Sequence, residues 1–165
     1  MDPAYDEPTE LRPLEPAVRR VWRIKAGLLW GALFIGTAIY EIIAMFGGGG
    51  ILPFGLLMTA VFVVGTLYVV IQPTLRYRFW RFDLRSDELF LERGILTRVR
   101  TIVPLRRIQH IDVSQDVLER EFDLGKLVVH TAGARSSEVE LPGLRYSEAQ
   151  QLRETLKQYI LEDAV

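Results

Sequence analysis

The chain has 165 residues, of which 49% are hydrophobic and 25% are charged. The charges are unevenly placed, because residues 26–71 contain no Lys or Arg and a single acid, Glu41. This distribution excludes a purely soluble domain, and the abundance of large apolar residues excludes disorder over most of the chain. The absence of cysteine excludes a disulfide framework, a thiol nucleophile and a zinc ribbon.

The first 18 residues combine five acids with four prolines. Prolines at this spacing prevent a continuous helix, and the acids resist burial. We therefore expect residues 1–18 to form a disordered acidic tail in the cytoplasm.

Residues 19–73 predict a helical hairpin in a membrane. Two apolar stretches, 26–46 and 51–71, each supply about the 20 residues that cross a bilayer as a helix. Buried helices of soluble proteins rarely run so long without a charged edge, and both stretches exceed the apolar core of a signal peptide. The run Gly47–Gly50 predicts the turn between the two helices.

Basic residues flank this hairpin on one side only. The turn has none, whereas four precede the first stretch and four follow the second: Arg19, Arg20, Arg23 and Lys25, then Arg76, Arg78, Arg81 and Arg85. The positive-inside rule then places both ends of the hairpin in the cytoplasm. We expect a multi-pass protein of the inner cell membrane with cytoplasmic N- and C-termini.

Two features inside the apolar stretches suggest specific roles. Gly27 and Gly31 form a GxxxG pair, which favours close packing between the two helices of the hairpin over a dedicated dimer face. Glu41 lies near the outer end of its stretch, opposite the region of Leu56, where the sequence has no basic partner. A carboxylate at this depth suggests function, but we expect it to reach the outer interface or to stay protonated.

Residues 74–162 change to the pattern of short strands followed by one helix. Alternating runs are separated by turn residues, and one of them, residues 95–105, places Leu96, Arg98, Arg100 and Ile102 on one strand face. Ser114 is expected to cap a brief helical turn after these strands, and Ser147 a final helix with an apolar stripe. The stripe consists of Ala149, Leu152, Leu156, Tyr159 and Ile160. The predicted fold class is α+β, an antiparallel roll or barrel capped by the C-terminal helix.

Residues 15–161 resemble the bacterial pleckstrin-homology-like family of YdbS-type membrane proteins. The resemblance is carried by the "RG" of Arg93-Gly94, by "IVPLRRIQHI", by Thr131-Ala132-Gly133 and by the later "LPGL". It implies two transmembrane helices followed by a PH-like roll, and no established ligand. One departure is Phe122-Asp123-Leu124, where the family usually has Phe-Gly-Leu. We expect this difference to move the turn by a residue or two.

The sequence offers little chemistry for catalysis. His110 shares strand parity with Asp112, but no GxSxG, P-loop or GxGxxG motif accompanies the pair. Neither His110 nor His130 has a second metal ligand at a typical spacing. We expect hydrogen-bonded structural histidines, no metal, no cofactor and no enzyme activity.

The charge within residues 76–165 divides in two. Residues 76–107 carry a net charge of +5, and residues 108–165 carry −5. The basic half follows the membrane segment directly, so it is suited to contact anionic lipid, although arginines after a span are also expected for topology alone. The predicted lipid-binding residues are Arg78, Arg81, Arg98, Arg100, Arg106 and Arg107.

These features predict a non-enzymatic membrane protein whose PH-like domain scaffolds protein interactions at the membrane. The alternative is a module that binds anionic lipid headgroups through the basic face. Expected partners are membrane lipids and a membrane or cytoplasmic protein, with a homo-oligomer left open. Nucleic acid is not expected, because the overall pI is about 6.2.

Overall fold

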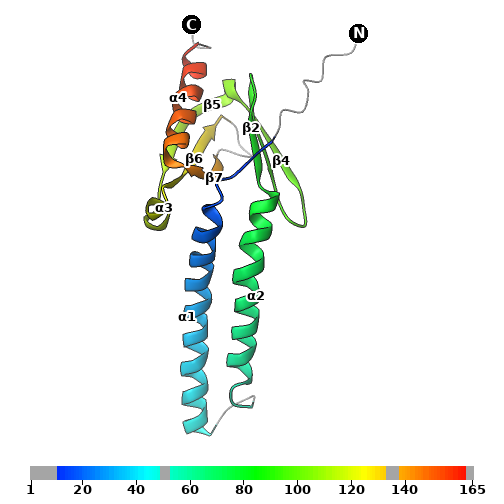
Figure 1. Ribbon diagram of the computed structural model, residues 1–165, viewed down its shortest axis with the longest axis vertical. Helices are drawn as coiled ribbons and strands as arrows, with labels where there is room; N and C mark the ends of the chain where they lie inside the picture. The colour runs from blue at the N-terminus through cyan, green and yellow to red at the C-terminus, as the bar shows by residue number, and fades with distance from the viewer. Residues whose placement is uncertain (1–10, 49–52, 133–137, 163–165) are drawn as a thin grey trace. The chain divides into compact units, whose positions relative to one another are not determined.

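The computed structural model describes residues 11–48, 53–132 and 138–162, with side chains described as far as residue 159 (Figure 1). The chain forms two compact units. One is the helical segment Arg19–Leu75, and the other combines the chain before this segment with the chain after it. Residues 1–10, the turn residues Gly49 and Gly50 and the predicted start of the second span at Ile51 lie outside the described residues.

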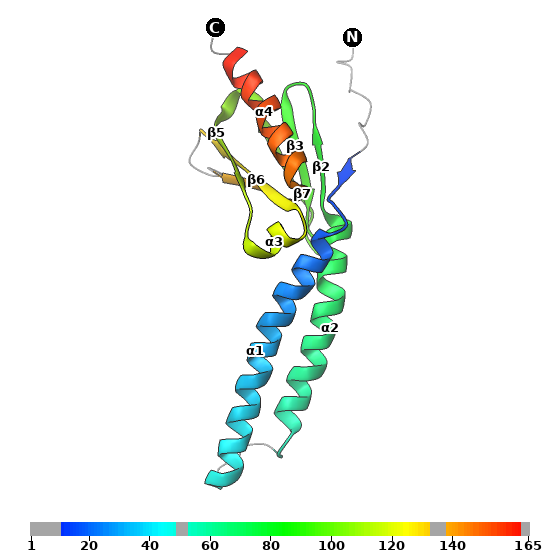
Figure 2. The same cartoon turned by 60° about the vertical axis from the view of Figure 1, so that its left-hand side comes forward.

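The hairpin consists of α1 (Val18–Gly47) and α2 (Leu56–Phe79), which run side by side in both views (Figures 1 and 2). Both helices are long and apolar enough to cross a membrane. The second helix, with Arg76 and Arg78 in its last turn, begins and ends later than the predicted stretch 51–71. Aromatic pairs join the helices, with ring centroids 5.7 Å apart for Trp30 and Tyr68.

Glu41 caps the start of α2. Its carboxylate accepts backbone N–H bonds from Gly55 (2.8 Å), Leu57 (3.0 Å) and Met58 (3.2 Å), and its side chain is buried. The first N–H groups of a helix have no partner within the helix, and bulk water is scarce at membrane depth. The predicted position opposite Leu56 is confirmed, and the partner of the carboxylate is a helix N-terminus instead of a cation.

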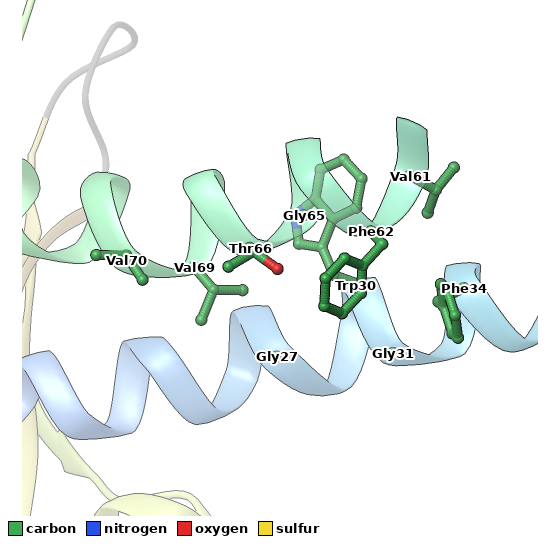
Figure 3. A pocket seen from close by; sticks show the side chains of 10 residues that line it. All are labelled: Gly27, Trp30, Gly31, Phe34, Val61, Phe62, Gly65, Thr66, Val69 and Val70. Carbon is green, nitrogen blue, oxygen red and sulfur yellow. The ribbon is translucent and has the colours of Figure 1, made fainter. Parts of the chain in front are cut away.

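Close packing between the helices does not use the GxxxG pair. A Cβ atom added at Gly27 or at Gly31 would meet nothing within 4 Å, whereas one at Gly65 of α2 would lie 2.9 Å from the Trp30 ring. The prediction for Gly27 and Gly31 within the hairpin was therefore wrong. The large Trp30 side chain fits over Gly65, and the GxxxG face borders an apolar groove of about 320 Å³ (Figure 3).

The second unit is built from two antiparallel sheets. Sheet A has the order β1-β2-β3-β4, and sheet B has the order β5-β6-β7. The strands of sheet A are β1 (Arg12–Pro13), β2 (Arg81–Leu84), β3 (Glu88–Arg93) and β4 (Val99–Pro104). Those of sheet B are β5 (Ile108–Ser114), β6 (Leu124–Thr131) and β7 (Glu138–Arg145). The 3-10 helix η1 (Leu105–Arg107) joins the sheets, and α3 (Val117–Glu121) lies between β5 and β6.

The C-terminal helix α4 (Tyr146–Glu162) packs on sheet B (Figure 2). Its predicted apolar stripe is confirmed at Ala149 and Leu156, which are both fully buried, and is wrong at Tyr159, which is exposed. Leu152 is half-buried, and the side chain of Ile160 lies outside the described residues. The predicted capping residues are wrong by one or two positions. The helix already includes Ser147, and α3 is capped by Asp116, whose side chain accepts from the Glu119 N–H in a capping box.

The end of the predicted tail belongs to the folded domain. Arg12 and Pro13 pair with β2, and Leu14 is almost completely buried. The Glu15 N–H donates to the Gly143 carbonyl at 2.8 Å, and the Glu15 carboxylate lies 3.2 Å from Arg145 Nε. The prediction of a disordered tail was therefore wrong for residues 11–18. These residues, which we call the N-terminal arm, contact both sheets because β2 and β7 offer partners that are distant in the sequence.

Asp123 stands where the resemblance to the family led us to expect glycine. Its φ of 52° lies in the left-handed region, which glycine adopts without a steric penalty and Asp tolerates better than most residues. The Asp123 carbonyl accepts from the Tyr146 N–H at 3.0 Å. The turn therefore stays at Asp123, and the predicted shift by a residue or two was wrong.

Candidate interaction surface

Strand register gives sheet A two distinct ends. Arg81 of β2 pairs with Glu92 of β3, which pairs with Arg100 of β4. This row lies where the chain leaves α2, and we call it the helix end of sheet A. Glu88 and Pro104 pair at the opposite end, which we call the distal end. The two rows are four residues apart along each strand, or about 13 Å.

Two arginines at the helix end contact the residues that follow the membrane helix. Arg81 Nη1 donates to the Trp80 carbonyl at 2.8 Å, close to the C-terminus of α2. The guanidinium carbon of Arg93 lies 5.9 Å from the centre of the Trp80 ring. Arg81 is half-buried. Its hydrogen bond satisfies a carbonyl just after the end of α2, a position where a cation is commonly favourable. Arg93 was not among the predicted residues, because its neighbour Glu92 made it look like part of a neutral pair.

Three of the predicted lipid-binding arginines are exposed at this end. Arg78 lies in the last turn of α2, and Arg98 lies between β3 and β4. Arg100 lies on β4 with its Nε 3.4 Å from the Glu92 carboxylate, so part of its charge is offset. Arg78, Arg93 and Arg98 therefore provide most of the exposed positive charge at the helix end.

The connection between β3 and β4 is an apolar turn at the same end. It contains Ile95 and Leu96, and the Leu96 side chain is 99% exposed. Gly94, with a φ of 116°, makes the turn possible, because a Cβ there would lie 1.9 Å from the Thr97 carbonyl oxygen. The prediction that Leu96 and Arg98 lie on a strand was wrong, since β4 begins at Val99. Gly94 was the signal in the sequence that could have located this turn.

Arg106 and Arg107 lie away from the other arginines. They belong to η1, which directly follows the distal end of β4. Arg106 borders a hollow of about 500 Å³ whose lining mixes both signs of charge: Ser86, Asp87, Glu88, Pro104, Leu105, Arg106 and Tyr159. The six predicted arginines therefore do not form one patch, because the length of β4 separates Arg98 and Arg100 from Arg106 and Arg107.

The two histidines lie side by side on sheet B. His110 and His130 are cross-strand partners, and both approach the Asp112 carboxylate, with Nε2 to oxygen distances of 2.9 Å and 3.4 Å. The expected link between His110 and Asp112 is confirmed, and His130 joins it. Among the described residues, no group of three or more His, Cys, Asp or Glu is arranged to hold a metal ion.

Comparison with known proteins agrees with this architecture. The family model of the bacterial PH domain matches residues 27–160. The chain belongs to the bacterial PH domain family. It is 34% identical over 98 residues to the UPF0699 transmembrane protein YdbS of Bacillus subtilis (strain 168), covering 59% of this chain and 60% of that relative. It is also 24% identical over 91 residues to the UPF0699 transmembrane protein YdbT of the same organism, covering 54% of this chain and 18% of that relative.

The chain thus spans 60% of the length of the first relative and 18% of the length of the second. No solved structure gave a significant match. Together with the two long apolar helices, the family identifies a transmembrane protein that carries a bacterial PH domain. The recognition and the α+β fold class predicted from the sequence are confirmed.

Proposed function

We propose that this chain is a non-enzymatic scaffold that holds a PH domain at the cytoplasmic face of the inner membrane and binds a protein partner along β4. The observation that carries the proposal is the concentration of exposed apolar residues. Of six large apolar side chains exposed on the described part of the domain, four lie in the segment 95–102: Ile95, Leu96, Val99 and Ile102. Exposed apolar residues grouped in one segment mark interaction sites more often than scattered ones do. Val99 and Ile102 are three residues apart on β4, so they lie on opposite faces of this strand.

The position of β4 favours a partner that adds a strand. β4 is the last strand of sheet A, so one of its backbone edges faces away from β3. A free edge offers N–H and C=O groups to an extended segment, and neighbouring side chains select which segment binds. Ile102, exposed in the middle of this edge strand, would contact such a segment. The same edge of a second copy is the alternative occupant.

A photoreactive amino acid at Ile102 tests the scaffold in its own membrane. Crosslinks to one defined protein, which decrease when Val99→Lys is added, are expected. Gln150, exposed on α4, is the matched control position and should give none of these crosslinks. Equal crosslinking from both positions would contradict a specific site at β4, and a crosslinked dimer of this chain would replace the partner with a second copy.

Binding of anionic lipid headgroups is the second candidate function. It is favoured by the exposed Arg78, Arg93 and Arg98 at the helix end, directly after the membrane segment. Each basic residue close to an anionic surface contributes about 1 kcal/mol, which is enough to orient a domain that is already tethered there. The contact should weaken with salt, because exposed charges are screened.

The orientation also belongs to the proposal, and it rests on the one-sided distribution of Arg and Lys. The cysteine-free chain permits a direct test with single cysteines. Gly48→Cys, at the turn of the hairpin, should react with an impermeant thiol reagent added outside intact cells. Ser86→Cys, exposed on the domain, should react only after the cells are opened. The reverse pattern would overturn the cytoplasmic location of the domain.

A further inference from the structure

We propose that the turn between β3 and β4 inserts Ile95 and Leu96 through the headgroup layer as far as the start of the acyl chains, with Arg93 and Arg98 contacting anionic lipid headgroups beside it. The proposed ligand is an anionic lipid surface. This inference deepens the lipid-binding candidate and rests on it, but it adds an apolar contact that the basic residues alone do not provide.

The covalent connection places this turn at the end of sheet A that follows α2. Arg81 begins β2 two residues after the last residue of α2, and it is paired with Glu92 of β3. The turn follows directly after Arg93, whose guanidinium lies over Trp80. The turn is therefore at the end of sheet A where the chain leaves an apolar helix, and this follows from register and connectivity alone.

The chemistry of the turn suits the interface between water and hydrocarbon. Single exposed leucines are common on soluble proteins, so the exposure of Leu96 by itself indicates little. Here Leu96 is accompanied by the exposed Ile95 and Val99, and arginines stand on both sides at Arg93 and Arg98. Arginine can keep its charge among headgroups while its aliphatic stem lies along apolar groups. The two arginines and the apolar residues between them therefore suit the same membrane interface.

The turn is also held in one shape. Six residue pairs join β3 to β4 directly beside it, from Arg93 and Val99 to Glu88 and Pro104. The close approach of Gly94 to the Thr97 carbonyl oxygen leaves no room for a side chain at position 94. Because the turn is ordered before it meets the lipid, insertion requires little further ordering of the chain.

The opposite end of the sheet provides an internal control. The turn between β2 and β3 contains the exposed polar residues Ser86 and Asp87, followed by Glu88. It shares β3 with the apolar turn, but its acids would be repelled by anionic lipid. A probe at Ser86 therefore measures the quenching expected at the end of sheet A that is not proposed to contact lipid.

The test uses the full chain in nanodiscs that contain zwitterionic lipid with or without anionic lipid. An environment-sensitive fluorophore is attached to Thr97→Cys or, as the control, to Ser86→Cys. Nitroxide is placed either on the lipid headgroup or at a shallow position of the acyl chain. In anionic nanodiscs, the Thr97 probe should lose fluorescence with both nitroxides, and the Ser86 probe with neither.

Substitutions then separate the apolar contact from the charged one. Ile95→Ser with Leu96→Ser should abolish quenching by the acyl-chain nitroxide and retain quenching by the headgroup nitroxide. Arg93→Gln with Arg98→Gln should abolish the preference for anionic lipid, whereas Arg106→Gln with Arg107→Gln, the matched change at the distal end, should leave it intact. Both pairs are exposed, so folding should be preserved.

The outcomes distinguish the insertion from the function on which it rests. Quenching of the Thr97 probe by the headgroup nitroxide alone would overturn insertion and support headgroup binding. Quenching by neither nitroxide would overturn both. If the Thr97 probe is protected from both nitroxides while Ile102 crosslinks to a protein, the turn is part of the scaffold surface and the lipid proposal is wrong.

Discussion

The hairpin and the PH domain contain the same types of apolar residue, but the hairpin exposes many of them and the domain buries them. Leu28 and Leu29 of α1 are 65% and 70% exposed, whereas Leu127 and Leu141 of sheet B are completely buried. In the hairpin, lipid is the medium that these side chains contact, so few of them need a protein partner. In the domain, water is the medium, and removal of apolar surface from water stabilises the fold. The comparison teaches that burial stabilises one unit and that lipid exposure is compatible with the other.

Polar groups show the converse difference. In the described part of the domain, paired strands satisfy much of the backbone, and surface charges meet water. At the turn side of the hairpin, a single carboxylate, Glu41, accepts three N–H groups at the start of α2. One polar side chain therefore has a larger structural role in the hairpin than most polar side chains have in the domain.

The largest expected effect is on the buried face of α4. Leu156→Asp places a carboxylate in the core between α4 and sheet B. We expect this to lower the free energy of unfolding by several kcal/mol, out of the roughly 5–15 kcal/mol that is typical of a domain. Limited proteolysis of the full chain in detergent should show a digested domain and an intact hairpin. Gln158→Asp, exposed on the same helix, is the control and should resist digestion. Equal resistance of both variants would mean that α4 does not cover the sheet.

A second prediction tests the carboxylate in the hairpin. Glu41→Ala removes the acceptor of three N–H groups, and each group left without a partner costs about 1–3 kcal/mol. Amide hydrogen exchange at Gly55, Leu57 and Met58 should become faster, while exchange in the domain stays unchanged. Thr37→Val, which removes a hydroxyl that donates to the Phe34 carbonyl in its own helix, should have no such effect. Unchanged exchange in Glu41→Ala would show that water or lipid replaces the cap.

A third prediction concerns the N-terminal arm. Gly143 has a φ of 69°, and a Cβ there would lie 2.8 Å from a methyl group of Val18. We expect Gly143→Ala to destabilise the domain by about 1–3 kcal/mol, because it strains the backbone and displaces the arm. Thermal unfolding of the full chain measures this. Gly36→Ala, with open space around it in α1, should not lower the melting temperature, because alanine favours a helix more than glycine does. Equal melting temperatures would show that the arm does not contribute to stability.

The smallest expected effect has the opposite sign. Asp123→Gly should stabilise the domain by about 0.5–1 kcal/mol, because the left-handed conformation carries a steric penalty for a residue with a Cβ. A small rise in the denaturant midpoint of the domain, with no change in the hairpin, is expected. A fall would mean that the Asp123 side chain provides a contact worth more than the backbone strain.

Much of the hairpin could be predicted from composition. A stretch of apolar residues without charges has few alternatives, and the position of Glu41 opposite Leu56 followed from counting residues from the turn. The strands and the final helix were predicted from periodicity, and Leu156 is buried as expected. The boundaries were less accurate, as at Ser147 and at the start of α2, because helix ends depend on caps such as Glu41 that come from elsewhere in the chain.

The candidate site shows where local patterns stop being informative. By itself, the sequence determined the two apolar helices, the α+β class of the domain, the family and the excess of arginine after the hairpin, since each depends on composition or on short periodic patterns. Only the tertiary structure decided that residues 11–18 join both sheets and that Arg106 lies apart from Arg98. The physical reason is that strand pairing joins residues far apart in the sequence, and register then determines which charges share an end of the sheet.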